Sequence, residues 1–230
     1  MNLEIEILNN YQSFFDRYTK NENVSFYWNK IYEPKYLNFD KKITKVLSEK
    51  KINFKIFKEN TLNENNEIKK NDGTPFKVFT PFWKTAESFY IEKGFTKDSY
   101  VKKRKKIVKI YNSSKNIDEI LPNKDWYKKF EKYWTPSEKQ ALKACKEFIK
   151  EKINKYDTER DIPRVEGTSK ISPFLANGQL NVETVWEMCS QITNKKKGYR
   201  KYINELGWRE FSHSLINYFP EMLEGNLRKE

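Results

Sequence analysis

Residues 24–57 read VSFYWNKIYEPKYLNFDKKITKVLSEKKINFKIF, and the order of residue types in this stretch sets the fold class. Short runs at 24–28 and 52–57 are rich in aromatic and β-branched residues, which is typical of strands. Between them the apolar residues recur at helical spacing, which predicts a helix that ends near Lys50. A strand, a helix and a strand in this order indicate a parallel α/β layer.

On the N-terminal side of this stretch, apolar residues recur at helical spacing, which predicts a helix over residues 3–18. Only two strands are visible in the whole sequence. A two-stranded parallel sheet leaves open edges and encloses little core. We therefore expect further strands of this sheet to lie before the first residue.

The remainder of the chain predicts helices. The polar run from Lys58 to Gly73 has no periodicity and predicts a loop, and strand signals are absent from Pro81 onward. A helix is expected over residues 83–91. Asn181 can cap another helix, and Gly198 precedes a longer one that ends at Tyr218.

Residues Thr135-Pro136-Ser137-Glu138 have the pattern of a capping box with proline at the first helical position. The helix that follows is expected to end near Tyr156. Its expected buried residues are Leu142, Phe148 and Ile149.

Composition indicates a folded protein with an excess of positive charge. The 230 residues include 6 Trp, 14 Tyr and 16 Phe, and the mean hydropathy of -0.94 argues against a membrane span. The formal charge is +13, and most of the excess lies after residue 80. The run from Lys93 to Lys109 is strongly basic and reads as a connector. A polyanion such as DNA is the leading partner class, and biased codon composition is the alternative.

Several classes of site are excluded. Two cysteines cannot form a disulfide framework, and a single histidine, His213, argues against a zinc site. The phosphate-loop motif and the dinucleotide-binding glycine motif are absent. The N-terminus has no signal pattern, so a cytoplasmic protein is expected.

Two segments carry groups suited to ligand chemistry. From Gly167 to Ser172, backbone N–H groups, three hydroxyls and Lys170 suit a phosphate or pyrophosphate, while an ordinary capped loop is the alternative. In the helix around residues 202–211, Tyr202, Glu205 and Arg209 share one face, with Trp208 beside it. Here the alternative is an Arg–Glu surface pair beside an aromatic core stripe.

Four segments in order resemble the DNA photolyase and cryptochrome family, specifically the photolyases that repair cyclobutane pyrimidine dimers. They are Phe26-Tyr27-Trp28-Asn29 with Tyr32-Glu33-Pro34, Pro75-Phe76-Lys77-Val78-Phe79-Thr80-Pro81-Phe82-Trp83, Gly167-Thr168-Ser169-Lys170-Ile171-Ser172-Pro173, and Trp208-Arg209-Glu210-Phe211. The resemblance covers nearly the whole chain. It implies a fragment: part of a parallel α/β antenna domain over residues 1–92, a basic connector over 93–115, and the first, truncated part of a helical FAD-binding domain over 116–230.

The resemblance also implies roles for individual residues. Tyr156 matches a flavin contact, and the residues around the FAD phosphates are Thr168, Ser169, Lys170, Ile171 and Ser172. Lys170 stands where the family more often has arginine, so charge is kept but the bidentate fork is lost. On the lesion side, Arg160 matches a DNA-backbone contact, and the other implied FAD or lesion contacts are Tyr202, Glu205, Trp208 and Arg209. Tyr202 also departs from the family, which commonly has an indole at this position.

The implied activity is light-driven repair of pyrimidine dimers in DNA by electron transfer from reduced FAD. The damaged nucleotides would be flipped out of the duplex into the pocket. Alternatives are a cryptochrome-like flavin photoreceptor and a basic DNA-binding fragment without catalysis, and a separately encoded C-terminal part is a possible partner. Where some relatives hold an antenna folate, this sequence has Lys35 and Tyr36, so weak or no folate binding is expected there and the antenna chromophore is unassigned.

Overall fold

The computed structural model describes residues 3–6, 11–20, 24–64, 66–94, 110–113 and 125–227. By their contacts, the residues divide into two compact units, each built from several chain segments. One unit contains residues 1–26, 45–54 and 96–135, and the other contains residues 27–44, 55–95 and 136–230. All the predicted flavin and DNA contacts belong to the second unit.

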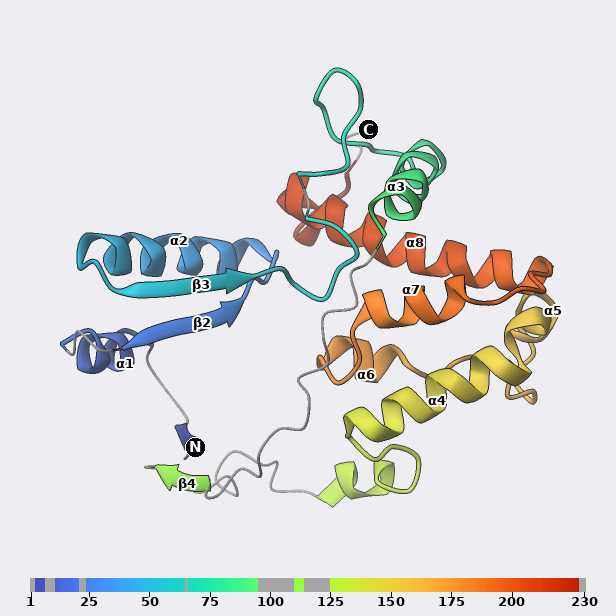
Figure 1. The fold of residues 1–230 in the computed structure, drawn as a ribbon, viewed down its shortest axis with the longest axis horizontal. Helices are drawn as coiled ribbons and strands as arrows, with labels where there is room; N and C mark the ends of the chain where they lie inside the picture. Colours follow the sequence, from blue (N-terminus) through green and yellow to red (C-terminus); the bar gives the residue numbers. More distant parts are fainter. Residues whose placement is uncertain are drawn as a thin grey trace. The chain divides into compact units, whose positions relative to one another are not determined.

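The predicted alternation of strand and helix is confirmed. Strand β2 (Ser25–Asn29), helix α2 (Pro34–Glu49) and strand β3 (Asn53–Phe57) follow one another, and the two strands run in the same direction (Figure 1). The Lys30 N–H donates to the Phe57 carbonyl at 2.9 Å. Helix α2 buries Ile43 and Leu47, which lie four residues apart and therefore on one face. The fold class, α/β followed by helices, is as the sequence predicts.

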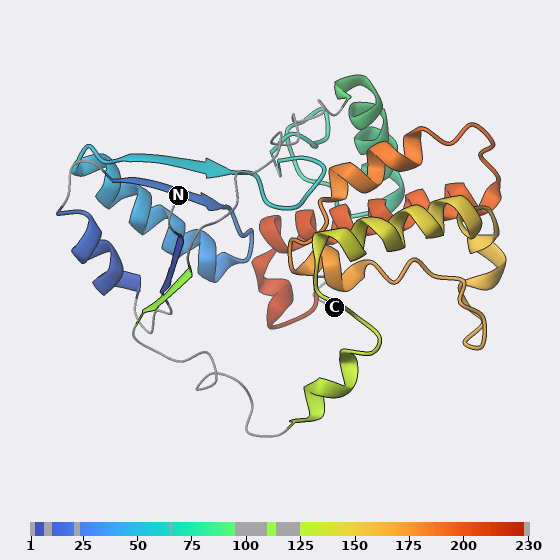
Figure 2. The same ribbon diagram turned by 60° about the horizontal axis from the view of Figure 1, so that its bottom comes forward.

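Two predictions about strands are wrong. Strand β1 (Leu3–Glu6) occupies the start of the expected N-terminal helix, which begins only with α1 (Tyr11–Tyr18). Strand β1 pairs in parallel with β4 (Ile110–Ser113), so a strand also lies after residue 81 (Figure 2). Leu3 to Glu6 alternates apolar and acidic residues, a period of two that a wider helical window hides. Strand β4 was missed because the lysine-rich residues just before it obscure its short apolar pattern.

The second unit is dominated by helix α8 (Lys197–Tyr218), which contacts α3 (Phe79–Lys93), α5 (Tyr156–Glu159), and the 3-10 turns η3 (Ile153–Lys155) and η4 (Pro220–Leu223). The other helices of this unit are α4 (Glu138–Glu151), α6 (Ser172–Ala176) and α7 (Val182–Ser190). A further 3-10 turn, η2 (Asp125–Phe130), belongs to the first unit. The side chains that α8 buries recur at intervals of three and four residues, so they form one broad face of the helix. They are Tyr202, Ile203, Leu206, Glu210, Phe211 and Ser214.

The helix starts show which local signals are reliable. Asn181 caps α7 as predicted, and its side chain accepts from the Glu183 N–H at 2.7 Å. Helix α4, however, is capped by Ser137, whose hydroxyl accepts from the Gln140 N–H at 3.2 Å. The capping box at Thr135 is therefore wrong, because Pro136, the next residue, lies before the cap and not at the first helical position.

Helix α4 also differs from its prediction at the far end and on its buried face. It ends at Glu151, and η3 and α5 follow as separate turns rather than as its continuation. Of the three residues expected to be buried, Phe148 is buried, but Leu142 and Ile149 are only half-buried. Ala141 and Cys145 take their place in the core. The stripe is shifted by one position because α4 packs against both η3 and α7.

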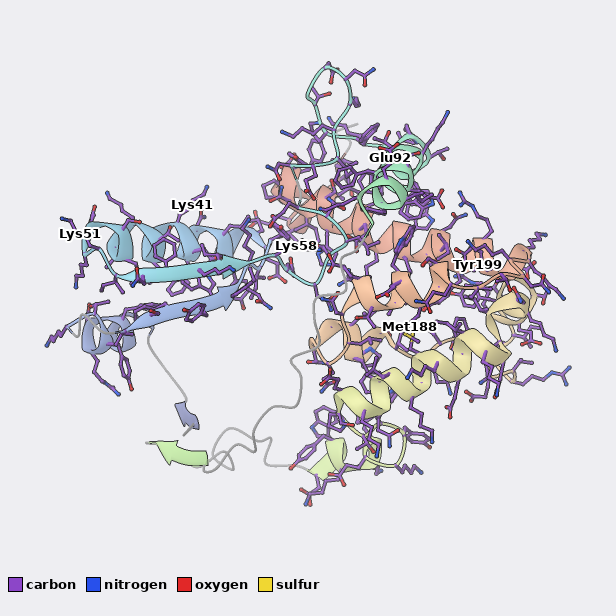
Figure 3. The ribbon with its side chains drawn as sticks, in the orientation of Figure 1. Lys41, Lys51, Lys58, Glu92, Met188 and Tyr199 are labelled. Atoms are coloured by element: carbon purple, nitrogen blue, oxygen red, sulfur yellow. The ribbon has the colours of Figure 1, made fainter. Side chains whose placement is uncertain are left out.

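The described residues of the predicted loop after β3 form no helix or strand, yet the first part of this loop is buried. Leu62 is 0% exposed. Asn60 binds α6 and α7 through three hydrogen bonds: its amide donates to the carbonyls of Leu175 and Leu180, and its oxygen accepts from the Val182 N–H. Lys58, labelled in Figure 3, forms an ion pair with Glu183 at the start of α7. Polar side chains here satisfy buried backbone groups, which a composition-based prediction of a loop does not foresee.

Candidate functional site

Helices α5 and α8 bring four of the predicted site residues together. The Tyr156 ring lies edge-on to Tyr202, with centroids 5.2 Å apart. The Arg160 guanidinium lies over the Tyr156 ring at 5.1 Å and forms an ion pair with Glu205. Spacings of four residues on α5 and three on α8 place each pair on one helix face. An aromatic wall and a charged pair therefore meet at this contact.

The environment fixes the protonation of these groups. Burial raises the pKa of Tyr156 and raises that of Tyr202 well above its ordinary value, so both are neutral phenols near pH 7. For Arg160, burial alone would lower the pKa, but the hydrogen bond to Glu205 and the nearby charges raise it. Arg160 therefore stays a cation whose charge is partly balanced by Glu205.

The segment from Gly167 to Ser172 reaches this cluster through one residue. The side chain of Ser169 lies near the Tyr202 phenol and opposes the rise of its pKa that burial causes. Gly167 is buried, and a Cβ atom there would lie 2.7 Å from the Glu159 backbone, so the segment passes very close to α5. Ile171 is buried, whereas Thr168, Lys170 and Ser172 are exposed.

Lys170 has a backbone φ of 52°, in the left-handed region that non-glycine residues seldom adopt. Its ammonium group forms an ion pair with Glu166, and its side chain is 53% exposed. The structure therefore places the predicted phosphate-binding cation at the surface beside a carboxylate.

Trp208 and Arg209 lie further along α8, next to the start of α3. The Trp208 side chain stacks on Phe79 with a centroid distance of 3.8 Å and an interplanar angle of 9°. Trp208 nevertheless remains 46% exposed. Arg209 donates to the Glu210 carboxylate at 2.8 Å, so the alternative of an Arg209–Glu205 surface pair is not what forms.

Glu210 is a buried carboxylate that the sequence analysis did not single out. Its second oxygen accepts from the Leu62 N–H at 2.7 Å, which joins the loop after β3 to α8. Burial raises the pKa of Glu210 to about 7, while burial and the Arg209 charge lower the pKa of His213 to about 4. In the sequence, the one sign of a buried role for Glu210 is its place in the Trp208–Phe211 segment, next to large aromatic residues.

These two pKa shifts predict opposing effects of pH on stability. Folded Glu210 keeps its proton up to about pH 7, so its contribution is present below the unfolded pKa of 4.5 and is lost as pH rises through 7. Folded His213 stays neutral down to about pH 4, so its contribution is lost as pH falls below 6.5. We expect Glu210→Gln to leave only the second effect, so that stability rises steadily between pH 4 and 6.5. Urea unfolding at several pH values measures this, and a variant that follows the wild-type profile would contradict the assignment.

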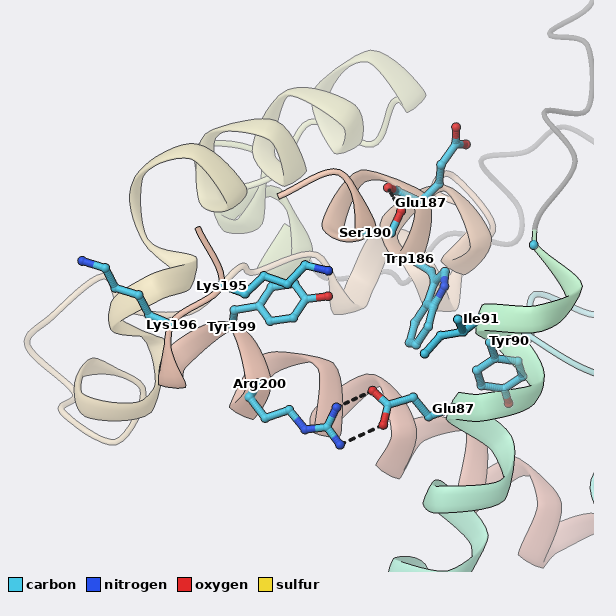
Figure 4. A pocket seen from close by; sticks show the side chains of 11 residues that line it. Glu87, Tyr90, Ile91, Trp186, Glu187, Ser190, Lys195, Lys196, Tyr199 and Arg200 are labelled. Carbon is cyan, nitrogen blue, oxygen red and sulfur yellow. Dashed lines mark hydrogen bonds and ion pairs between the residues drawn. The ribbon is translucent and has the colours of Figure 1, made fainter. Parts of the chain in front are cut away.

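A cavity of about 670 Å³ lies elsewhere in the second unit, between α3, α7 and the start of α8 (Figure 4). A bidentate ion pair between Arg200 and Glu87 closes one side of it. None of the predicted flavin or DNA contacts lines this cavity. The candidate site is therefore the α5–α8 cluster with Trp208, and not this cavity.

Comparison with known proteins identifies the family. A family model described as DNA photolyase matches residues 16–98. A deoxyribodipyrimidine photo-lyase of Agrobacterium fabrum is 30% identical over 204 residues, which are 86% of this chain and 42% of that protein. The crystal structure of a bacterial class III photolyase from Agrobacterium tumefaciens matches with a TM-score of 0.77 and 27% identity, over 94% of this chain and 45% of that one. This chain belongs to the DNA photolyase and cryptochrome family.

This photolyase-family chain spans about two fifths of the length of the curated relatives that it matches. A cryptochrome of Synechocystis matches with a TM-score of 0.63 at 17% identity, which shows the shared fold alone. In the part of the chain that the structure describes, no helix is long and apolar enough to cross a membrane. The same residues contain no group of three His, Cys, Asp or Glu side chains that could hold a metal ion.

The donor set of the photolyase-family chain fits the phosphates of FAD. Ammonium and hydroxyl groups are the donors that phosphate oxygens accept, and the exposed hydroxyls of Thr168 and Ser172 flank Ser169 and Lys170 in the chain. The Tyr156–Tyr202 pair adjoins Ser169, and both rings are buried. The flavin, when bound, would thus meet the polar segment, with the buried aromatic pair supporting that segment from behind.

Proposed function

We propose that this chain supplies FAD-binding and lesion-binding residues of a photolyase that repairs cyclobutane pyrimidine dimers in DNA. The carrying observation is the meeting of Tyr156, Arg160, Tyr202 and Glu205, with the exposed face of Trp208 on the same helix. Reduced FAD, when bound, would supply the photochemistry: an electron passed to the dimer under blue light and returned to the flavin once the two cyclobutane bonds have broken. The cofactor provides the chemistry, while the chain binds, orients and excludes water.

Each side chain has a binding role in this proposal. Trp208 presents an indole face on which a flipped-out base can stack. Glu205 accepts a hydrogen bond from the edge of a base, and Arg160 binds a backbone phosphate as a cation held in place by Glu205. Arg209 lies between the flavin and DNA sides. The hydroxyls of Thr168, Ser169 and Ser172, with Lys170, hold the pyrophosphate, and the backbone of Ile171 completes that loop.

We also propose the division into an antenna part (1–92), a connector (93–115) and an FAD-binding part (116–230). Residues 95–109 and 114–124 lie outside the described residues, so the connector stays a prediction. The folate expectation at Lys35 and Tyr36 also stays a prediction. Cys145 and Cys189 are buried free thiols, which fits the proposed reducing, cytoplasmic location.

The deciding experiment is flavin retention. The purified chain is soaked in FAD, freed of excess cofactor, and examined for flavin absorbance. Bound flavin supports the proposal. A colourless protein that binds damaged and undamaged DNA equally, with a steep salt dependence, would instead indicate a basic DNA-binding protein, since phosphate contacts carry no lesion information.

Removing the charge of Lys170 is expected to weaken FAD binding about tenfold, because a hydrogen bond to a charged group contributes about 1.5 kcal/mol. Titration of Lys170→Ala with FAD, followed by flavin fluorescence, measures the loss. Lys143→Ala is the matched control, because Lys143 also forms an exposed i,i+4 ion pair with a glutamate. Equal FAD affinity in the two variants would remove Lys170 from the site.

Replacing Trp208 with alanine is expected to lower the preference for dimer-containing DNA about 5- to 150-fold, since base stacking on an aromatic side chain contributes about 1–3 kcal/mol. Competition between oligonucleotides with and without one thymine dimer gives this ratio. Trp126→Ala is the control, because Trp126 is also exposed but lies on η2. If both tryptophan variants keep the wild-type ratio, Trp208 does not read the lesion.

A further inference from the structure

We propose that Phe79 is a positioning residue that holds the Trp208 indole in the orientation needed to receive a flipped base. This inference rests on the proposed lesion-binding role of Trp208. Phe79 lies more than 120 residues before Trp208 in the sequence, at the first position of α3. Its role therefore follows from the contact between α3 and α8.

The contact between the two rings is a close parallel stack. Centroids 3.8 Å apart and planes within 9° mean that Phe79 covers one face of the indole. Trp208 is 46% exposed despite this stack, and we infer that the face opposite Phe79 is the accessible one. A base that stacks on that face would add a third ring to the Phe79–Trp208 stack.

Phe79 is itself held from several sides. Phe211 lies edge-on to both rings, with centroids 6.0 Å from Phe79 and 6.0 Å from Trp208. One turn along α3, Trp83 runs nearly parallel to Phe79 at 6.3 Å. Two residues before Phe79, the Lys77 ammonium lies over the Phe219 ring at 4.9 Å. The stack is thus fixed at the start of α3 rather than on a free loop.

The register between α3 and α8 is set by the next contact. The Trp83 indole N–H donates to the Asn204 side chain at 3.0 Å, and the Trp83 ring packs where α8 has Gly207. Phe79 and Trp83 are four residues apart and so lie on the same face of α3. With Trp83 seated at Gly207, Phe79 is brought onto the adjacent Trp208.

Without Phe79, the indole would lose the neighbour that selects its rotamer. A partly exposed tryptophan with free rotamers must be ordered when the base binds, and that ordering opposes binding. Stacked aromatic pairs contribute about 0.5–1.5 kcal/mol beyond buried area, which corresponds to a change in affinity of about two- to tenfold. Undamaged duplex DNA keeps its bases stacked inside, so its affinity should not change.

The test compares the ratio of affinities for an oligonucleotide with one thymine dimer and the same oligonucleotide without damage. Phe79→Leu should lower this ratio about two- to tenfold. Phe79→Tyr should keep the wild-type ratio, because its ring can still stack on Trp208. Phe82→Leu is the control for lost stability. Phe82 lies on the same helix, is fully buried, and packs on Phe211. Phe82→Leu should leave the ratio of affinities unchanged.

Three outcomes would overturn the inference, and they are distinguishable. If Trp208→Ala lowers the ratio but Phe79→Leu does not, Trp208 reads the lesion without help from Phe79. If Phe82→Leu lowers the ratio as much as Phe79→Leu, the effect is one of general stability. If Trp208→Ala itself has no effect, the proposed lesion-binding role fails, and the role of Phe79 fails with it.

Discussion

Replacing Glu210 with alanine is expected to lower the free energy of unfolding by about 1–3 kcal/mol, because a buried polar group that loses its hydrogen-bond partner bears its full desolvation cost. Arg209 would lose its carboxylate, and the buried Leu62 N–H would lose its acceptor. The loop after β3 would then be detached from α8 at this point. Urea unfolding of the purified chain at pH 5, where folded Glu210 keeps its proton and still contributes to stability, measures the loss.

Glu147→Ala is the matched control. Glu147 forms an exposed i,i+4 ion pair with Lys143, and exposed pairs contribute about 0–1 kcal/mol. The large difference expected between the two variants comes from burial alone. A loss for Glu210→Ala no larger than that for Glu147→Ala would show that the carboxylate does not hold the loop.

Sequence reasoning succeeded where a local signal determines structure. The cap of α7 depends on Asn181 and the residues directly after it, and the β2–α2–β3 alternation depends on the periodicity of short windows. Both could be predicted. The same reasoning failed for β1 and β4, because the two strands stabilise each other across more than 100 residues of sequence. A four-residue segment has too little periodicity of its own to reveal such a partner.

The candidate site shows the same division. Helical spacing placed Tyr202, Glu205 and Arg209 on one face of α8, but it could not show that Glu205 would pair with Arg160 rather than with Arg209. That choice depends on how α5 packs against α8. Phe79 was also beyond reach as a contact of Trp208, since only the tertiary fold brings α3 to α8. The one local signal was Gly207, because a glycine inside a helix usually has a packing reason.

Gly207→Val is expected to destabilise the chain by about 3 kcal/mol, although valine favours helices slightly more than glycine does. A Cβ atom at position 207 would lie 2.5 Å from two atoms of the Trp83 ring. Trp83 is buried and bonded to Asn204, so its ring cannot move aside without loss of that hydrogen bond. The helices α3 and α8 must therefore separate, and the Phe79–Trp208 stack should loosen with them.

Urea unfolding measures this effect, and two further variants assign its cause. Gly225→Val is the matched control, since only the Glu221 carbonyl lies within 4 Å of a Cβ atom there, at 3.9 Å, and its cost should stay within about 0.5 kcal/mol. Trp83→Leu lowers stability by itself, but it removes the ring that valine strikes. In that background Gly207→Val should lower the free energy of unfolding much less than in the wild type, because the effects of substitutions at contacting residues are not additive. An undiminished cost in the Trp83→Leu background would mean that the glycine is required by α8 itself and not by its contact with α3.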